Sequence, residues 1–297
     1  MKILVTGCNG LLGQKMISLL ASVPEVTVIA TARTPLAGSW SVPFELMNIT
    51  DASAVARVVT AHAPDVIVHA AAMTQVDICE QNKEECYRVN VSGVENMIEA
   101  SRTCNAHLVH VSTDFIFDGK RDRLAEGDQP GPVNYYGQCK WQAEQLVVAS
   151  NISWSIVRTV LVYGIIPGVQ RSNIVTWVKQ SLEQGKQIRV VNDQWRTPTL
   201  AEDLAYGCYL VAKKRANGIY HISGKDFVSI YEIAMQTAAF FGLDDSLITP
   251  VESAALPQPA KRPLRTGFDI SKATSELGYH PHSLAEGISV LASQIGR

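Results

Sequence analysis

The sequence predicts an α/β protein built on a doubly wound parallel sheet, with a smaller α/β lobe toward the C-terminus. Over roughly the first 160 residues, short and almost continuously apolar runs alternate with apolar residues at helical spacing. A glycine-rich turn follows the first apolar run. Right-handed crossovers between parallel strands then place helices on both faces of the sheet. In the last third, prolines at 250, 257, 259, 263 and 281 divide the chain into shorter pieces.

The individual elements follow from these patterns in chain order. Strands are expected at residues 2–6, 26–31, 44–47, 65–70, 107–112 and 153–159, where the apolar runs fall. Helices are expected between them, at 11–20, from Asp51 onward, at 84–104 and at 136–149. Asp51 suits a helix start because its carboxylate can accept first-turn N–H groups. Beyond Tyr163 we expect helices at 174–184, 201–213, 231–241 and 284–295, with one return to the sheet at 218–222.

Composition excludes several classes of protein. The 26 basic and 28 acidic residues of this 297-residue chain leave a net charge of -2, which gives no electrostatic case for nucleic-acid binding. No apolar run approaches the ~20 residues that cross a bilayer, so no membrane segment is expected. The six cysteines show neither C-x-x-C nor zinc-finger spacing. We therefore expect a reduced, cytoplasmic protein without a metal site.

Three glycines after the first strand indicate a dinucleotide site. Gly7, Gly10 and Gly13 have the spacing G-x-x-G-x-x-G between the first strand and the first helix. Such glycines permit a tight turn, a close backbone approach to a pyrophosphate, and close packing of helix on strand. The N–H groups at the start of the helix can then bind phosphate. The turn residues Asn9, Leu11 and Leu12 are part of the expected cofactor site.

The end of the second strand bears on the choice of cofactor. An acidic residue about 20 positions beyond the glycine turn would bind a ribose 2′-hydroxyl, whereas an arginine there suits a 2′-phosphate. This chain has Arg33 at that place and no acidic residue. We therefore expect NADP(H), with NAD(H) left open. Asn48 and Asp51, after the third strand, are placed to meet the adenine edge, and a role as a helix cap alone is kept open for Asp51. Ile49 is also expected in the cofactor site.

A tyrosine and a lysine four residues apart suggest reduction or oxidation of a carbonyl. Tyr136 and Lys140 lie on one face of an expected helix. Hydride reduction of a ketone leaves an alkoxide that needs a proton, which a tyrosine can supply when a nearby cation lowers its pKa. Ser112, Thr113 and Asp114 end the fifth strand, at the edge where ligands bind in open α/β sheets. A hydroxyl there can hydrogen-bond a substrate carbonyl.

Several segments together resemble the extended short-chain dehydrogenase/reductase family, which has a Rossmann-type fold, and within it the dTDP-4-dehydrorhamnose reductases. They are TGCNGLLGQ (6–14), HAAAMTQVD (69–77), RVN (88–90), STDFIFDG (112–119), YYGQCK (135–140), VRTVLVYG (157–164), NDQWRTPT (192–199) and KRPLRTGFDISKATSELGY (261–279). The glycine turn and the Tyr/Lys pair mark only the superfamily, while the threonine segment and the two C-terminal segments are more specific.

The resemblance implies roles for individual residues. Thr113, Tyr136 and Lys140 would be catalytic, and Tyr136 and Lys140 would also contact the cofactor. Further cofactor contacts would come from Ala70, Ala71, Ala72, Asn90 and Ser112. The sugar nucleotide would be bound by Thr74, Val76, Thr113, Asp114, Leu161, Gln194 and Arg262, the last of these at the diphosphate. Residues 1–162 with about 199–223 would form the NADP-binding domain, and about 163–198 with 224–297 the substrate-binding domain.

The resemblance implies NADPH-dependent reduction of the 4-keto group of a dTDP-6-deoxy-4-hexulose. Some relatives are homodimers, so a homodimer is also expected as an option for this chain. Two departures touch the substrate region, since Leu161 replaces the usual tryptophan and Arg196 the usual glycine. A nucleotide-sugar epimerase or another keto-sugar reductase is therefore kept as an alternative. An NADP-binding regulatory subunit, resembling the β subunit of methionine adenosyltransferase, is a third. A dehydratase is disfavoured because Phe115 stands where a second carboxylate would follow Asp114.

Overall fold

The computed structural model describes residues 1–35, 42–166 and 173–295. Its largest element is a seven-stranded sheet in the order β12-β7-β5-β4-β1-β2-β3, in which every neighbouring pair is parallel. The strands are β1 (Lys2–Thr6), β2 (Thr27–Ala32), β3 (Phe44–Leu46), β4 (Val66–His69), β5 (His107–Thr113), β7 (Trp154–Thr159) and β12 (Gly218–His221). The doubly wound parallel sheet predicted from the sequence is confirmed.

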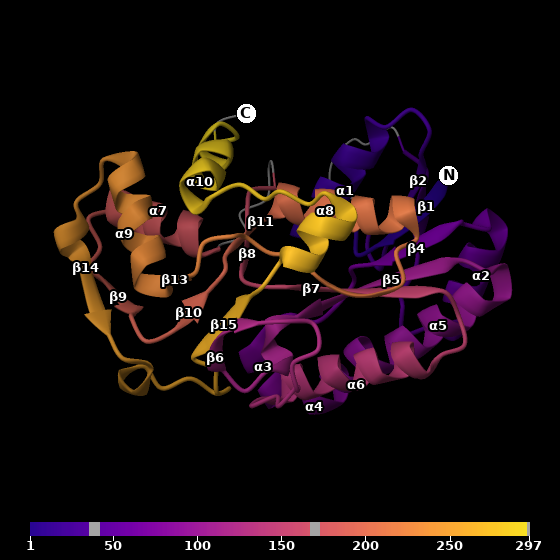
Figure 1. Cartoon of the computed structure of the whole chain (residues 1–297), viewed down its shortest axis with the longest axis horizontal. Helices are drawn as coiled ribbons and strands as arrows, with labels where there is room; N and C mark the ends of the chain where they lie inside the picture. The colour runs from indigo at the N-terminus through magenta and orange to yellow at the C-terminus, as the bar shows by residue number, and fades with distance from the viewer. Residues whose placement is uncertain (36–41, 167–172, 296–297) are drawn as a thin grey trace.

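Helices cover both faces of this sheet (Figure 1). On one face lie α2 (Ala52–His62), α5 (Gly93–Cys104) and α6 (Tyr135–Ala149), and on the other α1 (Leu11–Ala21) and α8 (Ala201–Lys214). Successive side chains of a strand point to opposite faces, so Ile3 and Val5 pack in the core with α1 and α8, whereas Leu4 packs with α2 and α5. Apart from the edge strand β3, most residues of these strands are buried, which explains their short apolar runs.

A second group of elements lies beside the large sheet, at the left of Figure 1. Its helices are α7 (Ile174–Glu183), α9 (Ile230–Phe241) and α10 (Leu284–Ala292). A four-stranded sheet has the order β13 (Val228–Ser229), β10 (Trp195–Arg196), β15 (Arg265–Phe268) and β6 (Lys120–Leu124). This group also contains two separate pairs of parallel strands. They are β8 (Val162–Tyr163) with β11 (Thr199–Leu200), and β9 (Ile188–Val191) with β14 (Ile248–Val251). The chain passes from β7 into this group, returns through α8 and β12, and then leaves the large sheet again.

The helical region expected at 84–104 is not one regular helix. It consists of α4 (Lys83–Tyr87), a π-helical segment η1 (Arg88–Ser92) and α5. Asn90 in η1 is buried and holds the backbone of Met73 through two hydrogen bonds, so the irregular turn aims a side chain inward. The short helix α3 (Val76–Gln81) was not expected either. The last helix ends at Ala292, three residues before the predicted end.

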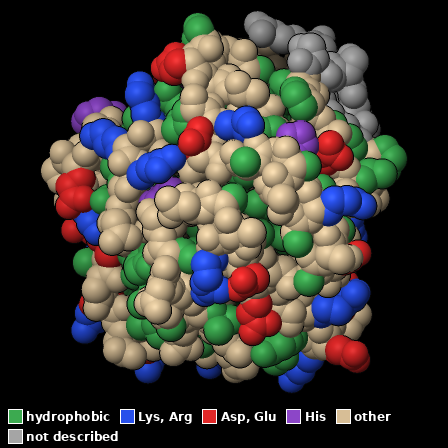
Figure 2. Space-filling view, turned by 90° about the vertical axis from the view of Figure 1, so that its right-hand side faces the viewer, with side chains coloured by type: hydrophobic (Ala, Val, Ile, Leu, Met, Phe, Trp, Pro, Cys, Tyr) green, Lys and Arg blue, Asp and Glu red, His purple; other side chains and the backbone are tan. Residues whose placement is uncertain are grey.

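None of the helices in the described ranges is long and apolar enough to span a membrane. On the face shown in Figure 2, Lys and Arg side chains are interspersed with Asp and Glu, in keeping with the nearly balanced charge of the chain.

Candidate active site

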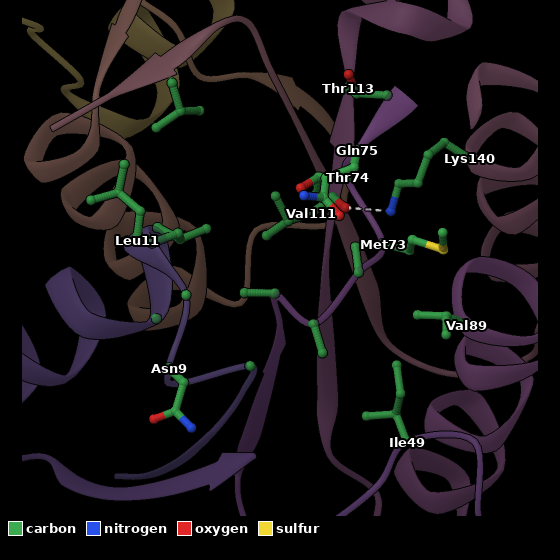
Figure 3. Close-up of a pocket in the computed structure, with 18 of the residues that line it drawn as sticks. Asn9, Leu11, Ile49, Met73, Thr74, Gln75, Val89, Val111, Thr113 and Lys140 are labelled. Carbon is green, nitrogen blue, oxygen red and sulfur yellow. Dashed lines mark hydrogen bonds between the residues drawn. The ribbon is translucent and has the colours of Figure 1, made fainter. Parts of the chain in front are cut away.

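A cavity of about 860 Å³ opens at the carboxyl ends of the central strands. Its walls come from the β1–α1 turn, the residues after β4, the end of β5, the first turns of α6 and the segment after β7. In Figure 3, Asn9 and Leu11 lie on one side of it and Lys140 and Val89 on the other. Ligands of open α/β sheets bind at this edge.

The glycine turn is packed so tightly that side chains are excluded at two of its positions. Gly7 has φ +69°, and a Cβ there would lie 2.8 Å from the Cα of Ala71. A Cβ on Gly13 would overlap the carbonyl oxygen of Gly7. Among the described residues no side chain caps α1 at Gly10, and Leu11, Leu12 and Gly13 line the cavity. The first turn of the helix therefore offers its N–H groups to an anion there.

Most residues expected at the adenosine end also line the cavity. Arg33 is exposed at its rim, next to Thr34. The side chain of Asn9 donates to the carbonyl oxygen of Pro35 at 3.1 Å, which joins the glycine turn to the chain after β2. Asn48 and Ile49 line the neighbouring wall.

Asp51, the other residue placed at the adenine edge by the sequence, is not among the residues that line the cavity. It caps α2 by accepting hydrogen bonds from the backbone N–H groups of Ser53 and Ala54, as expected for a helix start.

The segment after β4 forms the middle of the cavity wall. Ala70, Ala71 and Ala72 line the cavity, and the N–H of Ala71 donates to the Thr6 hydroxyl at 3.1 Å. Asn90, expected to contact the cofactor, lies behind this segment. Its Oδ1 accepts from the N–H of Met73, and its Nδ2 donates to the carbonyl oxygen of Met73, both at 2.9 Å. In this geometry Asn90 shapes the wall from behind.

Tyr136 and Lys140 project from α6 toward the end of β5. Asn134 starts that helix by accepting from the N–H of Gly137 at 2.8 Å. Lys140 Nζ donates to the carbonyl oxygen of Val111 at 2.8 Å (Figure 3) and lies 3.1 Å from Nε2 of His110. Burial lowers the pKa of Lys140 to about 8.

The environment keeps two neighbours of Lys140 uncharged. Burial, together with the charge of Lys140, holds the pKa of His110 well below its usual value, so its imidazole stays neutral and can accept from the ammonium. Burial raises the pKa of the Tyr136 phenol, while a hydrogen bond with Thr113 acts in the opposite direction. Tyr136 therefore remains protonated at neutral pH and is able to donate a proton.

Ser112 provides a further sign that a ligand belongs here. Its hydroxyl is buried at the cavity wall and has no hydrogen-bond partner among the described residues. Buried polar groups are normally hydrogen-bonded, so an orphaned hydroxyl in a large cavity points to a missing partner. The residues present thus fit a phosphate-bearing dinucleotide, with the glycine turn at one end and Ser112, Tyr136 and Lys140 at the other.

The residues expected to bind the sugar nucleotide divide into two groups. Thr74, Val76, Thr113, Asp114 and Leu161 line the cavity. Leu161 has φ +35°, a left-handed backbone conformation that is strained for a branched side chain and that re-aims the chain after β7.

Gln194 and Arg262 are not among the residues that line the cavity. Gln194 Nε2 donates to Ser253 Oγ at 2.9 Å. Arg262 makes two hydrogen bonds to the carboxylate of Asp77, at 2.9 and 2.6 Å, and these hold the pKa of Asp77 low. To bind a diphosphate, Arg262 would have to leave this pair.

Sequence reasoning missed several residues of the site. Met73, Gln75, Glu85, Arg88 and Val89 also line the cavity. Arg196, noted in the sequence only as a departure in the substrate region, contacts Asp114 from the second group of elements. Glu85 lay inside a predicted helix and carried no separate signal, whereas Met73, Gln75, Arg88 and Val89 lie in segments that carry the family resemblance but were not singled out. No group of metal-ligating side chains occurs within residues 1–35, 42–166 and 173–295.

Comparison with known proteins gives consistent matches. The family model described as RmlD substrate binding domain matches residues 1–295. The chain is 30% identical over 292 residues to a dTDP-4-dehydrorhamnose reductase from Aggregatibacter actinomycetemcomitans, covering 94% of each protein. It is 29% identical over 276 residues to methionine adenosyltransferase 2 subunit beta from Mus musculus, covering 91% of this chain and 81% of that protein.

Solved structures agree with these matches. A dTDP-4-dehydrorhamnose reductase from Clostridium acetobutylicum superimposes with a TM-score of 0.89 at 30% identity, covering 100% of both chains. A dTDP-4-dehydrorhamnose reductase from Bacillus anthracis str. Ames in complex with NADP gives a TM-score of 0.89 at 28% identity, covering 99% of each chain.

Proposed function

Because the chain belongs to the RmlD substrate binding domain family, we propose that it reduces the 4-keto group of a dTDP-6-deoxy-4-hexulose with NADPH, converting dTDP-4-dehydrorhamnose to dTDP-L-rhamnose. At the level of the family, the chain is an NAD(P)-dependent oxidoreductase of the dTDP-4-dehydrorhamnose reductase type, with NADP as its cofactor. The particular sugar nucleotide is the proposal. It is supported by Thr113, Tyr136 and Lys140, which meet at one cavity whose far end is the glycine turn.

The geometry gives each residue a task in this reaction. Bound NADPH supplies the hydride that reduces the carbonyl carbon. Tyr136 donates its phenolic proton to the oxygen left as an alkoxide. Lys140, held by Val111, places a positive charge near the phenolate that results and favours its formation. Thr113, whose proton is directed to Asp114, helps to orient the neighbouring Tyr136.

The cofactor would be held along the whole cavity. The first turn of α1 and the glycine turn would bind the pyrophosphate, and Arg33 the 2′-phosphate. Ser112 and Lys140 would contact the nicotinamide end, where the orphaned hydroxyl of Ser112 gains a partner. Thr74, Val76 and Leu161 would face the sugar.

The reaction is expected to slow above about pH 8. Burial lowers the pKa of Lys140 from 10.5 to about 8, so its charge is present below that pH and is lost above it. The measurement is kcat/KM for the keto-sugar as a function of pH. The Lys140→Arg variant, whose guanidinium does not deprotonate in this range, should be slower and should lack this limb. If kcat/KM of Lys140→Arg fell at the same pH as that of the wild type, the decrease would be due to the titration of another group.

A regulatory role is a second candidate, which the match to methionine adenosyltransferase 2 subunit beta favours. Such a protein would bind NADP and a partner protein without turnover.

An epimerase would oxidise and re-reduce its sugar and so would retain its cofactor through purification.

The decisive test follows NADPH absorbance with dTDP-6-deoxy-L-lyxo-4-hexulose, while NADPH binding is measured separately by its fluorescence. Rapid oxidation with formation of dTDP-L-rhamnose is expected. Binding of NADPH without oxidation would reject this substrate. Turnover of a different keto-sugar would then support another reductase, and no turnover with any keto-sugar would support the regulatory role.

A further inference from the structure

A buried ion pair lies directly beside Thr113. Asp114 and Arg196 are 2% and 3% exposed, and Arg196 Nε lies 3.4 Å from Asp114 Oδ2. The two residues come from different parts of the molecule, since Asp114 follows β5 and Arg196 belongs to β10. Charges this deeply buried are stable only when paired and hydrogen-bonded.

The rest of the guanidinium is fixed by backbone carbonyl groups. Arg196 Nη1 donates to the carbonyl oxygens of Trp195 and Leu264, at 2.8 and 3.0 Å, and Nη2 donates to that of Pro263 at 2.7 Å. These bonds use the outer edge of the guanidinium and leave Nε toward Asp114. Arg196 is therefore a rigidly held cation.

Asp114 in turn orders the Thr113 hydroxyl. Thr113 Oγ1 donates to Asp114 Oδ1 at 3.1 Å and accepts from the N–H of Phe115 at 3.3 Å. The other carboxylate oxygen accepts from the Thr266 hydroxyl at 2.5 Å. An ionised carboxylate can only accept, so as long as Asp114 is charged the proton of Thr113 points to it and the hydroxyl is held in one orientation beside Tyr136.

The charged and titratable groups that act on Asp114 come from two elements. Arg196 of β10 favours its ionised form, and Tyr136 of α6 is coupled to it electrostatically. β15 contributes only the Thr266 hydroxyl, while Arg262 acts on Arg196. Burial raises the pKa of Asp114, and Arg196 is the largest influence that lowers it. The ionisation of this carboxyl thus depends on Arg196.

We propose that Arg196 is a positioning residue for the reaction, because it keeps Asp114 ionised and ionised Asp114 fixes the direction of the Thr113 hydroxyl. Arg196 is not among the residues that line the cavity and acts through Asp114. This inference rests on the function proposed above.

The pairing itself can be tested without any turnover, by urea unfolding at several pH values. Removing the cation in Arg196→Met should raise the pKa of folded Asp114 further, because Arg196 is the largest influence that lowers it. A group whose folded pKa lies above its unfolded pKa binds more protons in the folded state, so stability falls as pH rises between the two values. In the wild type, the free energy of unfolding should stop falling once the pH exceeds the pKa of folded Asp114. In Arg196→Met the fall should continue to a higher pH, because that pKa is higher. Adding Asp114→Asn should remove this slope, and parallel curves for all variants would overturn the proposal.

The positioning role is tested by the pH profile of keto-sugar reduction. In Arg196→Met, kcat should fall roughly tenfold at neutral pH and the acid limb of kcat/KM should move upward by about 1–3 pH units. Arg196→Lys should restore the position of the limb, because it restores the charge. Arg189→Met, which removes an exposed arginine of the same lobe, should behave as the wild type. An unchanged acid limb in Arg196→Met, with loss of stability alone, would show a purely structural role.

Failure of the proposed function and failure of the proposed role of Arg196 give different results. If the wild type does not reduce the sugar, the proposed function fails, while the unfolding experiment still decides the pairing. If Arg196→Met does not fold, Asp114→Asn alone is used, since its amide cannot titrate. Its profile should lack the acid limb of the wild type, and retention of that limb would overturn the proposal.

Discussion

Replacement of Tyr136 by phenylalanine is expected to lower kcat for keto-sugar reduction by about 10²–10⁴-fold, the usual contribution of a positioned general acid. The phenol is buried and its pKa is raised, so it is protonated at neutral pH. Phenylalanine keeps the ring and its edge-on contact with Phe115, whose centroid lies 5.7 Å away. The fold and the cofactor site should therefore be retained.

The measurement compares single-turnover rates and NADPH binding in the wild type and Tyr136→Phe. The neighbouring Tyr135 provides a matched control, since it is not among the residues lining the cavity and its ring lies under the ammonium of Lys83. Tyr135→Phe should retain nearly full activity. Equal rates in Tyr136→Phe and the wild type would remove Tyr136 from the mechanism.

Replacement of Glu144 by glutamine is expected to lower the free energy of unfolding by about 3–5 kcal/mol, as for other buried ion pairs that lose one partner. Glu144 and Arg158 join α6 to β7, with side chains 0% and 2% exposed. Arg158 Nη2 donates to Glu144 Oε2 at 2.7 Å, and Nε donates to Oε1 at 3.1 Å. The variant leaves the Arg158 cation buried without a counter-charge.

Urea denaturation of the wild type and Glu144→Gln measures this effect. Glu99→Gln serves as the control, because it removes an exposed pair with Arg102 on α5 and should leave the midpoint almost unchanged. Equal midpoints for Glu144→Gln and Glu99→Gln would show that the buried pair adds no stability over a solvated one.

The large sheet was predictable because each of its strands carries a local signal. β1, β4 and β5 carry short apolar runs and are almost entirely buried, and the glycine turn stands where the first crossover must begin. β6 gave no such signal, since its sequence KRDRL is almost entirely charged. It is a strand because it pairs with β15, far along the chain, and that pairing is a property of the tertiary fold.

The candidate site shows the same division. The proximity of Tyr136 and Lys140 could be predicted from their spacing, because both residues lie on one helix. The contacts of Asp114 with Arg196 and of Asp77 with Arg262 each join residues far apart in sequence, so no local pattern could reveal them. Arg262 was expected at the diphosphate on resemblance alone, and only the three-dimensional contact with Asp77 shows how it is engaged.

The return of the chain through α8 and β12 bears on how this protein is made. α8 packs against α1, and β12 pairs with β7 at the edge of the large sheet. When a nascent chain has left the ribosome only as far as β7, α8 is not yet available to pack against α1, and the edge of β7 that pairs with β12 is exposed. The first half cannot complete its core until residue 221 has emerged, after the residues of α7, β9, β10 and β11. A truncation before α8 should aggregate, whereas co-expression of the missing segment should rescue it.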